Sequence, residues 1–350
     1  MSLRCVLVTG AGGFIGGHVV RDQLARGYRV RALDINGSPL EQLQAACGAD
    51  LEILIGDVAD AQTRRRAVAG VDVVMHLASA HLEKGLPDEA YERINVIAVE
   101  ALLQASVDAG VQRFIQVSSC GVHGSLAQSP GNEESPFCPD VAYERTKLAG
   151  EQAARQFWRK TGFSVVVVRP VWVYGPGCPR TEQLFDLLSA RRFLMIGRGV
   201  NLRASIYIAD FLDVMERCAA TADIGGEVFI ATHSEQVTVR QIVAEISRLV
   251  GARRRPVRIP IWLGWVLAAT VELAFGLIGK TPPITRRSLK FFTNDAGFSG
   301  SKAEAMLGFR PGHDLAAGLA VTHEWWRTRQ AGAPKPAAPG DKQGATADHG

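Results

Sequence analysis

The stretch TGAGGFIG, residues 9–16, decides the fold because of what stands on either side of it. An apolar, β-branched run precedes it, and residues with helical spacing follow it. In this context Gly10 lets the chain turn tightly, Gly13 lets the backbone approach a pyrophosphate, and Gly16 lets the helix pack on the strand. The amino terminus of the helix then faces the anion. The stretch therefore predicts a dinucleotide-binding loop.

The first half of the chain alternates short apolar runs with longer helical patterns. The expected strands are Leu3 to Thr9, Tyr28 to Leu33, Leu51 to Ile55, Asp72 to Leu77, Gln112 to Val117 and Ser164 to Val168. The expected helices include Phe14 to Arg26, Glu89 to Ala109 and Tyr143 to Thr161. Apolar strands that alternate with helices are typical of a parallel sheet covered on both faces. We expect an α/β fold with a doubly wound, Rossmann-type parallel sheet.

The alternation ends after Arg169, where proline and glycine clusters separate segments of weaker periodicity. The strand-like runs Ala204 to Ile208 and Glu227 to Ala231 could still return to the main sheet. We therefore expect a nucleotide-binding domain, a smaller substrate-binding part and a disordered tail. These comprise residues 1–170 with 203–232, residues 171–202 with 233–330, and residues 331–350.

Composition limits the classes of function. The chain of 350 residues has 39 Lys and Arg against 35 Asp and Glu, a net charge of +4, and its basic residues are dispersed apart from short clusters. This balance does not suggest nucleic-acid binding. The six cysteines lie far apart and lack metal-ligand spacing, so we expect no metal and thiols in a reducing compartment. No signal peptide is expected, and the expected location is cytoplasmic.

An acidic residue ends the second expected strand. Asp34 stands eighteen residues past the glycine loop, where a carboxylate accepts hydrogen bonds from the adenosine ribose and repels a 2′-phosphate. This favours NAD over NADP, although a turn with Asn36-Gly37 would also explain an acid here. Asp57 and the run Leu77-Ala78-Ser79 follow the third and fourth strands. They lie at the edge where such sheets bind ligands.

Tyr143 and Lys147 stand one helical turn apart, on the same face of an expected helix. A free tyrosine has a pKa of about 10, so its use as a base near neutral pH requires a shift of roughly 3 units, or about 4 kcal/mol. A lysine cation and a nicotinamide cation can supply this. Alone, such a pair more often marks a solvated helix face. Ser118-Ser119, after the fifth strand, favours a site, because a serine hydroxyl there can bond the substrate oxygen during proton exchange.

With these residues the sequence resembles the extended short-chain dehydrogenase/reductase family, also called the NAD-dependent epimerase/dehydratase family, over roughly residues 3 to 330. The matching positions are the 9–16 loop, Asp34, Gly56-Asp57-Val58, His76-Leu77-Ala78, Asn95, Ser118-Ser119, Tyr143 with Lys147, Arg169-Pro170 and Val173 to Pro176. The resemblance implies that Tyr143 is the acid/base, that Lys147 lowers its pKa and binds the nicotinamide ribose, and that Ser119 assists. It also implies a set of NAD-binding residues: Gly10, Gly13, Phe14, Ile15, Gly16, Asp34, Asp57, Val58, Leu77, Ala78, Asn95, Ser118, Tyr143, Lys147, Pro170 and Val173.

Two further positions concern the substrate. The family usually has Tyr-Gly after its serine strand, whereas this chain has His123-Gly124. We expect His123 to alter the substrate pocket without loss of catalysis. Arg203, seven residues before Asp210, resembles the arginine with which nucleotide-sugar epimerases hold a diphosphate. A surface arginine that precedes a strand would look the same.

The segment Ile259 to Gly279 is mainly apolar and about as long as a membrane span, but it contains Pro260 and Glu272 and has basic residues on both sides. Three interpretations stay open: a buried helix that roofs an apolar pocket, a helix on a membrane surface that uses residues 259–280, and a true span. With the residues that follow it, the segment resembles the 3β-hydroxysteroid and sterol dehydrogenase branch.

The leading hypothesis is therefore an NAD-dependent oxidoreductase that oxidises a secondary alcohol, or reduces a ketone, on a sterol-like or other lipid-like small molecule. The alternative is a nucleotide-sugar epimerase or dehydratase that uses tightly bound NAD. A non-catalytic NAD-binding protein is the least favoured hypothesis. The resemblance also implies a homodimer, formed through Glu89 to Ala109 and Tyr143 to Thr161.

Overall fold

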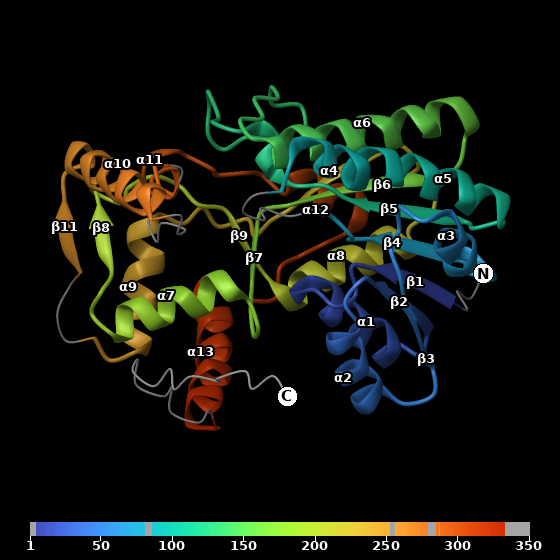
Figure 1. Ribbon diagram of the computed structural model, residues 1–350, viewed down its shortest axis with the longest axis horizontal. Coiled ribbons are helices and arrows are strands. Elements are labelled where there is room, and N and C mark those ends of the chain that lie inside the picture. The colour runs from blue at the N-terminus through green and yellow to red at the C-terminus, as the bar shows by residue number, and fades with distance from the viewer. Residues whose placement is uncertain (1–4, 81–85, 253–255, 279–284, 287, 333–350) are drawn as a thin grey trace, which may run out of the picture.

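A seven-stranded parallel sheet forms the centre of the larger half of the molecule (Figure 1). The computed structural model describes residues 5–80, 86–252, 256–278, 285–286 and 288–332. The strand order is β10-β6-β5-β4-β1-β2-β3, and every pair is parallel. The strands are β1 Cys5–Thr9, β2 Arg29–Asp34, β3 Leu51–Ile55, β4 Val73–His76, β5 Arg113–Val117, β6 Val165–Pro170 and β10 Val228–Ala231. The predicted α/β fold of the Rossmann type is confirmed.

Helices cover both faces of this sheet (Figure 1). One face carries α3 Ala61–Val68, α4 Asp88–Glu92, the π-helical turn η1 Arg93–Ile97, α5 Ala98–Asp108 and α6 Ala142–Thr161. The other face carries α1 Phe14–Ala25, α2 Gly37–Cys47 and α8 Ile208–Ala220. Strands β1, β4 and β6 are consequently buried along their whole length. Such strands need apolar residues on both faces, which is why they show as continuous runs in the sequence.

Only one of the two expected returning strands joins the main sheet. β10 pairs with β6, but β9, Ser205–Tyr207, pairs with β7, Trp172–Tyr174, in a separate two-stranded sheet. The expectation that the run from Ala204 returns to the main sheet is therefore wrong. The chain leaves the main sheet at Pro170, where β6 ends, and forms β7 shortly after. β9 pairs with β7 and therefore lies outside the main sheet. The division into domains itself stays a prediction.

The smaller part lies to the left of the main sheet in Figure 1. Its elements are α7 Pro179–Ser189, β8 Leu194–Ile196, α9 Val239–Leu249, β11 Val257–Ile259, α10 Ile261–Leu277, α11 Lys290–Thr293 and α13 Leu315–Gly332, whereas α12 Ser301–Leu307 packs on β10 and α8 of the larger half. Helices α7, α9 and α13 pack on one another, and β8 pairs with β11. Of the expected tail, residues 331 and 332 belong to α13, and 333–350 lie outside the described residues.

The apolar segment forms α10, and the interpretation of it as a buried roof is wrong. Only Gly264 and Ala268 of this helix are buried, whereas Trp262 is 66% exposed and Leu273 is 68% exposed. The small side chains let α10 approach β8 and leave the large ones outside. Within the described ranges, no helix is both long and apolar enough to cross a membrane. The flanking residues 253–255, 279–284 and 287 lie outside the described residues.

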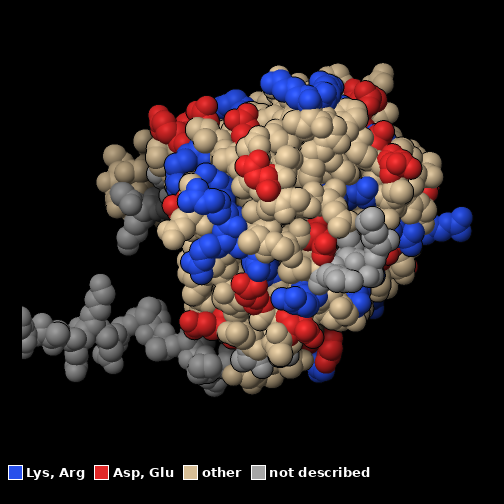
Figure 2. All heavy atoms as spheres, turned by 90° about the vertical axis from the view of Figure 1, so that its right-hand side faces the viewer, with Lys and Arg blue, Asp and Glu red and all other residues tan. Residues whose placement is uncertain are grey.

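Charged side chains lie interspersed on the end of the molecule that carries the sheet edge at β3 (Figure 2). Arg31 of β2, for example, forms an ion pair with Glu52 of the neighbouring β3 at 2.8 Å. Charges of opposite sign therefore partly neutralise one another over short distances on this face.

Candidate active site

The glycine loop between β1 and α1 packs closely against the chain just past the end of β4. Gly10 has φ of +70°, and a Cβ atom there would lie 2.7 Å from the backbone nitrogen of Ala78, past the end of β4. A Cβ atom at Gly16 would collide with the carbonyl oxygen of Gly10. The Gly13 N–H donates to that carbonyl at 3.1 Å, and α1 begins at the next residue, Phe14. Only glycine fits at the two crowded positions, and the first turn of α1 follows directly.

The Asp34 carboxylate is held against this loop. It accepts hydrogen bonds from the Gly12 N–H at 2.9 Å and from the Asn36 N–H at 3.0 Å. Both sequence interpretations are thus met by the same side chain, because Asp34 organises a turn and also stands beside the glycine loop. Asp57 is placed less favourably for a ligand, since it accepts from the Ala59 N–H at 2.8 Å and pairs with Arg93 at 3.0 Å.

The end of β4 is fixed by polar contacts. Thr9 Oγ1 lies 2.7 Å from Nδ1 of His76 and accepts from the Ala78 N–H at 3.1 Å. Asn95, in the π-helical turn, accepts from Ser79 Oγ and the Ala80 N–H, both at 2.9 Å, and its amide nitrogen donates to Ala80 O and to Thr146 in α6. The Asn95 side chain therefore ties β4 to α6, and its amide group is fully used by protein atoms.

The predicted catalytic residues meet at the carboxyl end of β5. Ser119 follows that strand, and its side chain forms a hydrogen bond with the phenol of Tyr143, from the first turn of α6. Burial raises the pKa of Tyr143 to about 12, while Ser119 and the nearby Arg180 guanidinium act to lower it. Tyr143 is therefore a neutral proton donor in the protein alone, and additional positive charge is needed to make it a base.

Lys147 lies one turn further along α6 and is buried. Its Nζ donates to the carbonyl oxygen of Val117 at 2.5 Å, and burial lowers its pKa to about 8, against the opposing effect of Glu151. Ser118, which follows Val117 at the end of β5, has a buried hydroxyl without a hydrogen-bond partner among the described residues. The Lys147 ammonium and the Ser118 hydroxyl, both at the end of β5, are groups that can bond a ribose. Pro170, the last residue of the neighbouring strand β6, and Val173 of β7 are also buried.

Behind Lys147 lies a buried ion pair. Arg169 and Glu151 are both 1% exposed and are joined by two hydrogen bonds, Nη2 to Oε1 at 2.5 Å and Nε to Oε2 at 3.0 Å. Nη1 of Arg169 also donates to the Glu133 carbonyl at 2.9 Å and lies 3.1 Å from Nε2 of His123. His123 is completely buried and stacks on Phe137, so its expected place in the substrate pocket is wrong. It belongs to the packing around Arg169.

Arg203 is a partly buried cation with different surroundings. Its Nη2 donates to the carbonyl of Lys290 at 2.9 Å, and its guanidinium carbon lies 5.0 Å from the ring centre of Phe291. Its Nε has no hydrogen-bond partner, and no carboxylate of the described residues forms an ion pair with it. Burial and the adjacent Arg180 guanidinium lower its pKa to about 10, against the opposing effect of the Asp295 carboxylate.

Arg180 is the residue that sequence reasoning missed. It lies in the first turn of α7, is exposed, and is close enough to act on the pKa of both Tyr143 and Arg203. The Ser119 hydrogen bond lowers the pKa of Tyr143 most, and the Arg180 guanidinium adds a smaller lowering effect. The sequence showed only an arginine after Pro179 in a turn-rich stretch. Its position depends on how α7 packs against the sheet.

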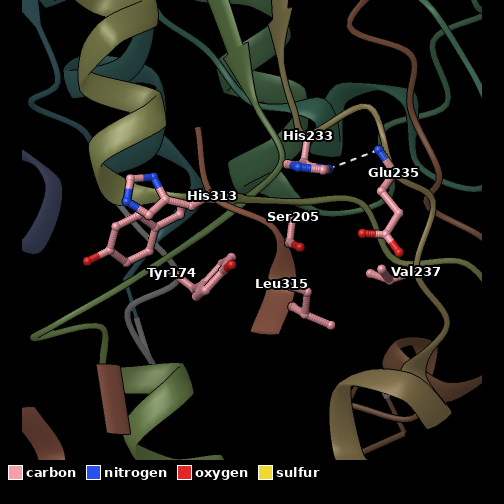
Figure 3. A pocket seen from close by; sticks show the side chains of 8 residues that line it. Tyr174, Ser205, His233, Glu235, Val237, His313 and Leu315 are labelled. Carbon is pink, nitrogen blue, oxygen red and sulfur yellow. Dashed lines mark hydrogen bonds between the residues drawn. The ribbon is translucent and has the colours of Figure 1, made fainter. Parts of the chain in front are cut away.

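A small pocket in the smaller part is separate from these residues (Figure 3). Its lining residues come from β7, β9, the segment after β10 and the segment before α13: Tyr174, Ser205, Tyr207, His233, Glu235, Val237, His313 and Leu315. Its polar groups bond to neighbours, as the Glu235 N–H does to Nδ1 of His233 at 2.9 Å. Ser119, Tyr143, Lys147 and Arg203 do not line it.

Comparisons with known proteins agree with this geometry. The model of the NAD dependent epimerase/dehydratase family matches residues 6–231. N-acetyl-alpha-D-glucosaminyl-diphospho-ditrans,octacis-undecaprenol 4-epimerase of Escherichia coli O157:H7 is 25% identical over 91% of this chain and 94% of its own. Sterol demethylase protein B of Methylococcus capsulatus is 31% identical over 92% and 98%. The structure of DesIV, a dTDP-glucose 4,6-dehydratase from Streptomyces venezuelae with NAD bound, is 27% identical over 93% and 98%, with a TM-score of 0.75.

Proposed function

The chain belongs to the NAD-dependent epimerase/dehydratase family, with NAD as its cofactor, and we propose that it acts as an epimerase or dehydratase on a sugar carried by a diphosphate. This is the alternative of the two sequence hypotheses. The preference for a sterol-like substrate rested on α10 as the roof of an apolar pocket, and α10 is exposed.

The observation that supports a diphosphate is the weakly compensated charge of Arg203, which forms no ion pair with a described residue and feels only the opposing influence of the Asp295 carboxylate. A buried guanidinium costs several kcal/mol of desolvation, of the order found for buried ions, unless an anion or a set of hydrogen bonds compensates it. Arg203 has one carbonyl, one aromatic ring and an unpaired Nε, with the like charge of Arg180 nearby. A diphosphate offers the two negative charges and multiple acceptors that two guanidinium groups bind well.

The place of Arg180 connects this anion site with the reacting group. Because Arg180 acts on both Arg203 and Tyr143, a diphosphate held between the two arginines would place the attached sugar next to the Tyr143 phenol. Binding energy from the diphosphate would then orient a sugar hydroxyl for proton transfer. Neutralising Arg180 with a phosphate also changes the charge that Tyr143 experiences.

The residues present fit NAD. The glycine loop leaves its backbone accessible at the start of α1, and the Ser118 hydroxyl lacks a partner beside Lys147. When bound, NAD would supply a hydride acceptor. Tyr143 would take the proton of the sugar hydroxyl, and in an epimerisation it would give the proton back. Ser119 would hold the oxygen in place, and Lys147 would bond the ribose instead of the Val117 carbonyl.

Known relatives support this assignment. The relative from Escherichia coli is named as an epimerase of a sugar diphosphate, and DesIV is named as a dehydratase of a nucleotide sugar. Both match more than nine tenths of this chain, so the likeness includes the part that contains Arg203. The resemblance does not choose between epimerisation and dehydration.

The direct test is to incubate the protein with a catalytic amount of NAD and separate pools of UDP-hexoses, dTDP-hexoses and 3β-hydroxysteroids. We expect a sugar to be converted without net NADH, because hydride returns to the substrate in both sugar reactions. Product identity by NMR distinguishes an epimer from a keto-deoxy sugar. Steady NADH formation with a steroid, and no change in any sugar, would overturn the proposal.

The second candidate is a dehydrogenase for a lipid-like alcohol. The likeness to sterol demethylase protein B and the apolar surface of α10 favour it. Such an enzyme gains nothing from a paired diphosphate site, so substitution of Arg203 would leave its KM unchanged.

We also propose that two chains associate through the face formed by α4, η1, α5 and α6. A groove on this face is lined by residues of α4 and α6, where Arg145 pairs with Asp88 at 3.2 Å, and Ile97 stands 56% exposed beside it. Sedimentation equilibrium should give twice the chain mass. An Ile97→Asp variant should give the chain mass.

A further inference from the structure

Helix α10 presents large apolar side chains over most of its circumference. Trp262, Leu273 and Leu277 are 66%, 68% and 81% exposed, and Trp265 and Val266 are also exposed. A contiguous apolar surface of this kind is rare on a soluble monomer and marks an interaction site. Among the described residues, no other helix of the smaller part carries a comparable group of exposed large apolar side chains.

The contact of α10 with the rest of the protein is narrow. It uses the small residues Gly264 and Ala268, which pack against Ile196 of β8 and Leu289 before α11. A Cβ atom at Gly264 would lie only 2.8 Å from a methyl group of Ile196. Two small residues four positions apart lie on the same side of the helix and form a narrow contact. The remaining surface of α10 is therefore free to bind another partner.

The few polar groups of α10 are already satisfied. The Thr270 hydroxyl donates to the carbonyl of Val266 at 2.9 Å. The Glu272 carboxylate accepts from the backbone N–H and the Nε of Arg286, at 2.8 and 2.7 Å. The helix therefore offers an apolar surface whose polar side chains would not be left unpaired if water were removed.

Basic side chains stand beside the amino-terminal end of α10. Arg258 of β11 and Arg198, which follows β8, are exposed, and neither forms an ion pair with a described residue. Gly197 contacts Ile261 and so fixes Arg198 near the start of the helix. The charge next to the apolar surface is thus positive, which complements anionic lipid headgroups.

We propose that α10 lies flat in the interface of an anionic lipid bilayer and docks the protein there. Exposed tryptophans with adjacent arginines are the chemistry of an interfacial helix. At about 1.5 Å per residue, its 17 residues span about 26 Å, less than the roughly 30 Å of a bilayer core. The helix lies at the end of the molecule away from the main sheet, so a planar surface can reach it (Figure 1).

Docking would set the substrate site at a fixed distance from the bilayer. Leu289 and Phe292 pack with α10, and between them Phe291 contacts the Arg203 guanidinium. One short segment around α11 therefore touches both the docking helix and the proposed anion site. The docking proposal does not rest on the proposed reaction.

The test uses the full chain with NAD and two kinds of vesicle, phosphatidylcholine alone and phosphatidylcholine with phosphatidylglycerol, in a flotation assay. We expect the protein to float with the anionic vesicles. Trp262→Ser with Leu273→Ser should lower the bound fraction about tenfold or more, because two interfacial anchors are lost. The matched control is Met306→Ser with Val321→Ser, which changes exposed apolar residues on α12 and α13 and should bind as before.

A separate pair of variants tests the contribution of the two arginines beside α10. Arg198→Gln with Arg258→Gln should weaken binding to the anionic vesicles only, whereas Arg65→Gln with Arg66→Gln, on α3, should not. Equal flotation of the α10 variant and its control would overturn the proposal. So would an unbound wild-type protein, or an α10 variant that changes only the particle mass in solution, which would mean that a second copy covers the helix.

Discussion

Two arginines, Arg169 fully buried and Arg203 partly buried, lie in two regions of the molecule and have different surroundings. Arg169, at the end of β6, is held by the Glu151 carboxylate, the Glu133 carbonyl, His123 and the ring of Phe137. Arg203, just before β9, has the Lys290 carbonyl, the ring of Phe291 and the more distant Asp295 carboxylate. The first charge is compensated within the fold. The second leaves its compensation to a ligand, and this difference separates a structural arginine from a binding one.

The largest expected effect is on the group between these regions. Tyr143→Phe should lower kcat by roughly 10³-fold, because the proton carrier is lost, and should leave NAD binding nearly unchanged. Tyr28→Phe is the control, since the Tyr28 hydroxyl bonds Glu216 away from the site. Steady-state kinetics and NAD fluorescence titration measure the two effects. Retention of most of the activity in Tyr143→Phe would remove Tyr143 from the mechanism.

The two arginines should respond differently to removal of charge. Arg169→Met should lower the free energy of unfolding by about 3–5 kcal/mol, because Glu151 is left buried and unpaired. Arg203→Met should leave it unchanged or raise it, because a weakly compensated charge is removed. Urea unfolding of both variants measures this. Equal losses of stability would contradict the comparison.

Lys147 provides a pH-dependent test of the inner region. Its pKa is lowered to about 8 in the folded protein from an ordinary value of 10.5, so between these two pH values the unfolded chain binds more protons than the folded one. The burial cost is present in full below pH 8 and is relieved as the pH rises toward 10.5. The stability of the wild type relative to Lys147→Met should therefore rise over this window, by at most about 3 kcal/mol. A difference that is constant with pH would show that Lys147 titrates normally.

A smaller effect is expected at the cofactor loop. Asp34→Asn should reduce the preference for NAD over NADP by about tenfold, because the repulsion of a 2′-phosphate is lost. Dissociation constants for both cofactors measure the change. Glu52→Gln, on the neighbouring strand β3, is the control for a general change in surface charge. An unchanged ratio of the two dissociation constants would mean that Asp34 only organises the turn with Asn36.

The sequence predicted best where local pattern and tertiary role coincide. Strands buried on both faces must be apolar throughout, and Gly10 and Gly16 are needed where the backbone is crowded, so both were visible as patterns. His123 was misplaced because its burial depends on Arg169, 46 residues away. Arg180 was missed because only the packing of α7 brings it to Tyr143. The sequence left three interpretations of α10 open and favoured the buried one, since an apolar helix shows the same sequence whether protein or lipid covers it.

The most direct test of the account is the affinity of a nucleoside diphosphate for the outer region. Calorimetric titration of UDP and of dTDP into the NAD-loaded protein should show binding to the wild type, at least about tenfold weaker binding to Arg203→Met and an intermediate value for Arg180→Gln. Arg64→Gln, on α3, should bind as the wild type does. Undiminished affinity in Arg203→Met, or no binding of either diphosphate to the wild type, would contradict the claim that Arg203 binds a diphosphate.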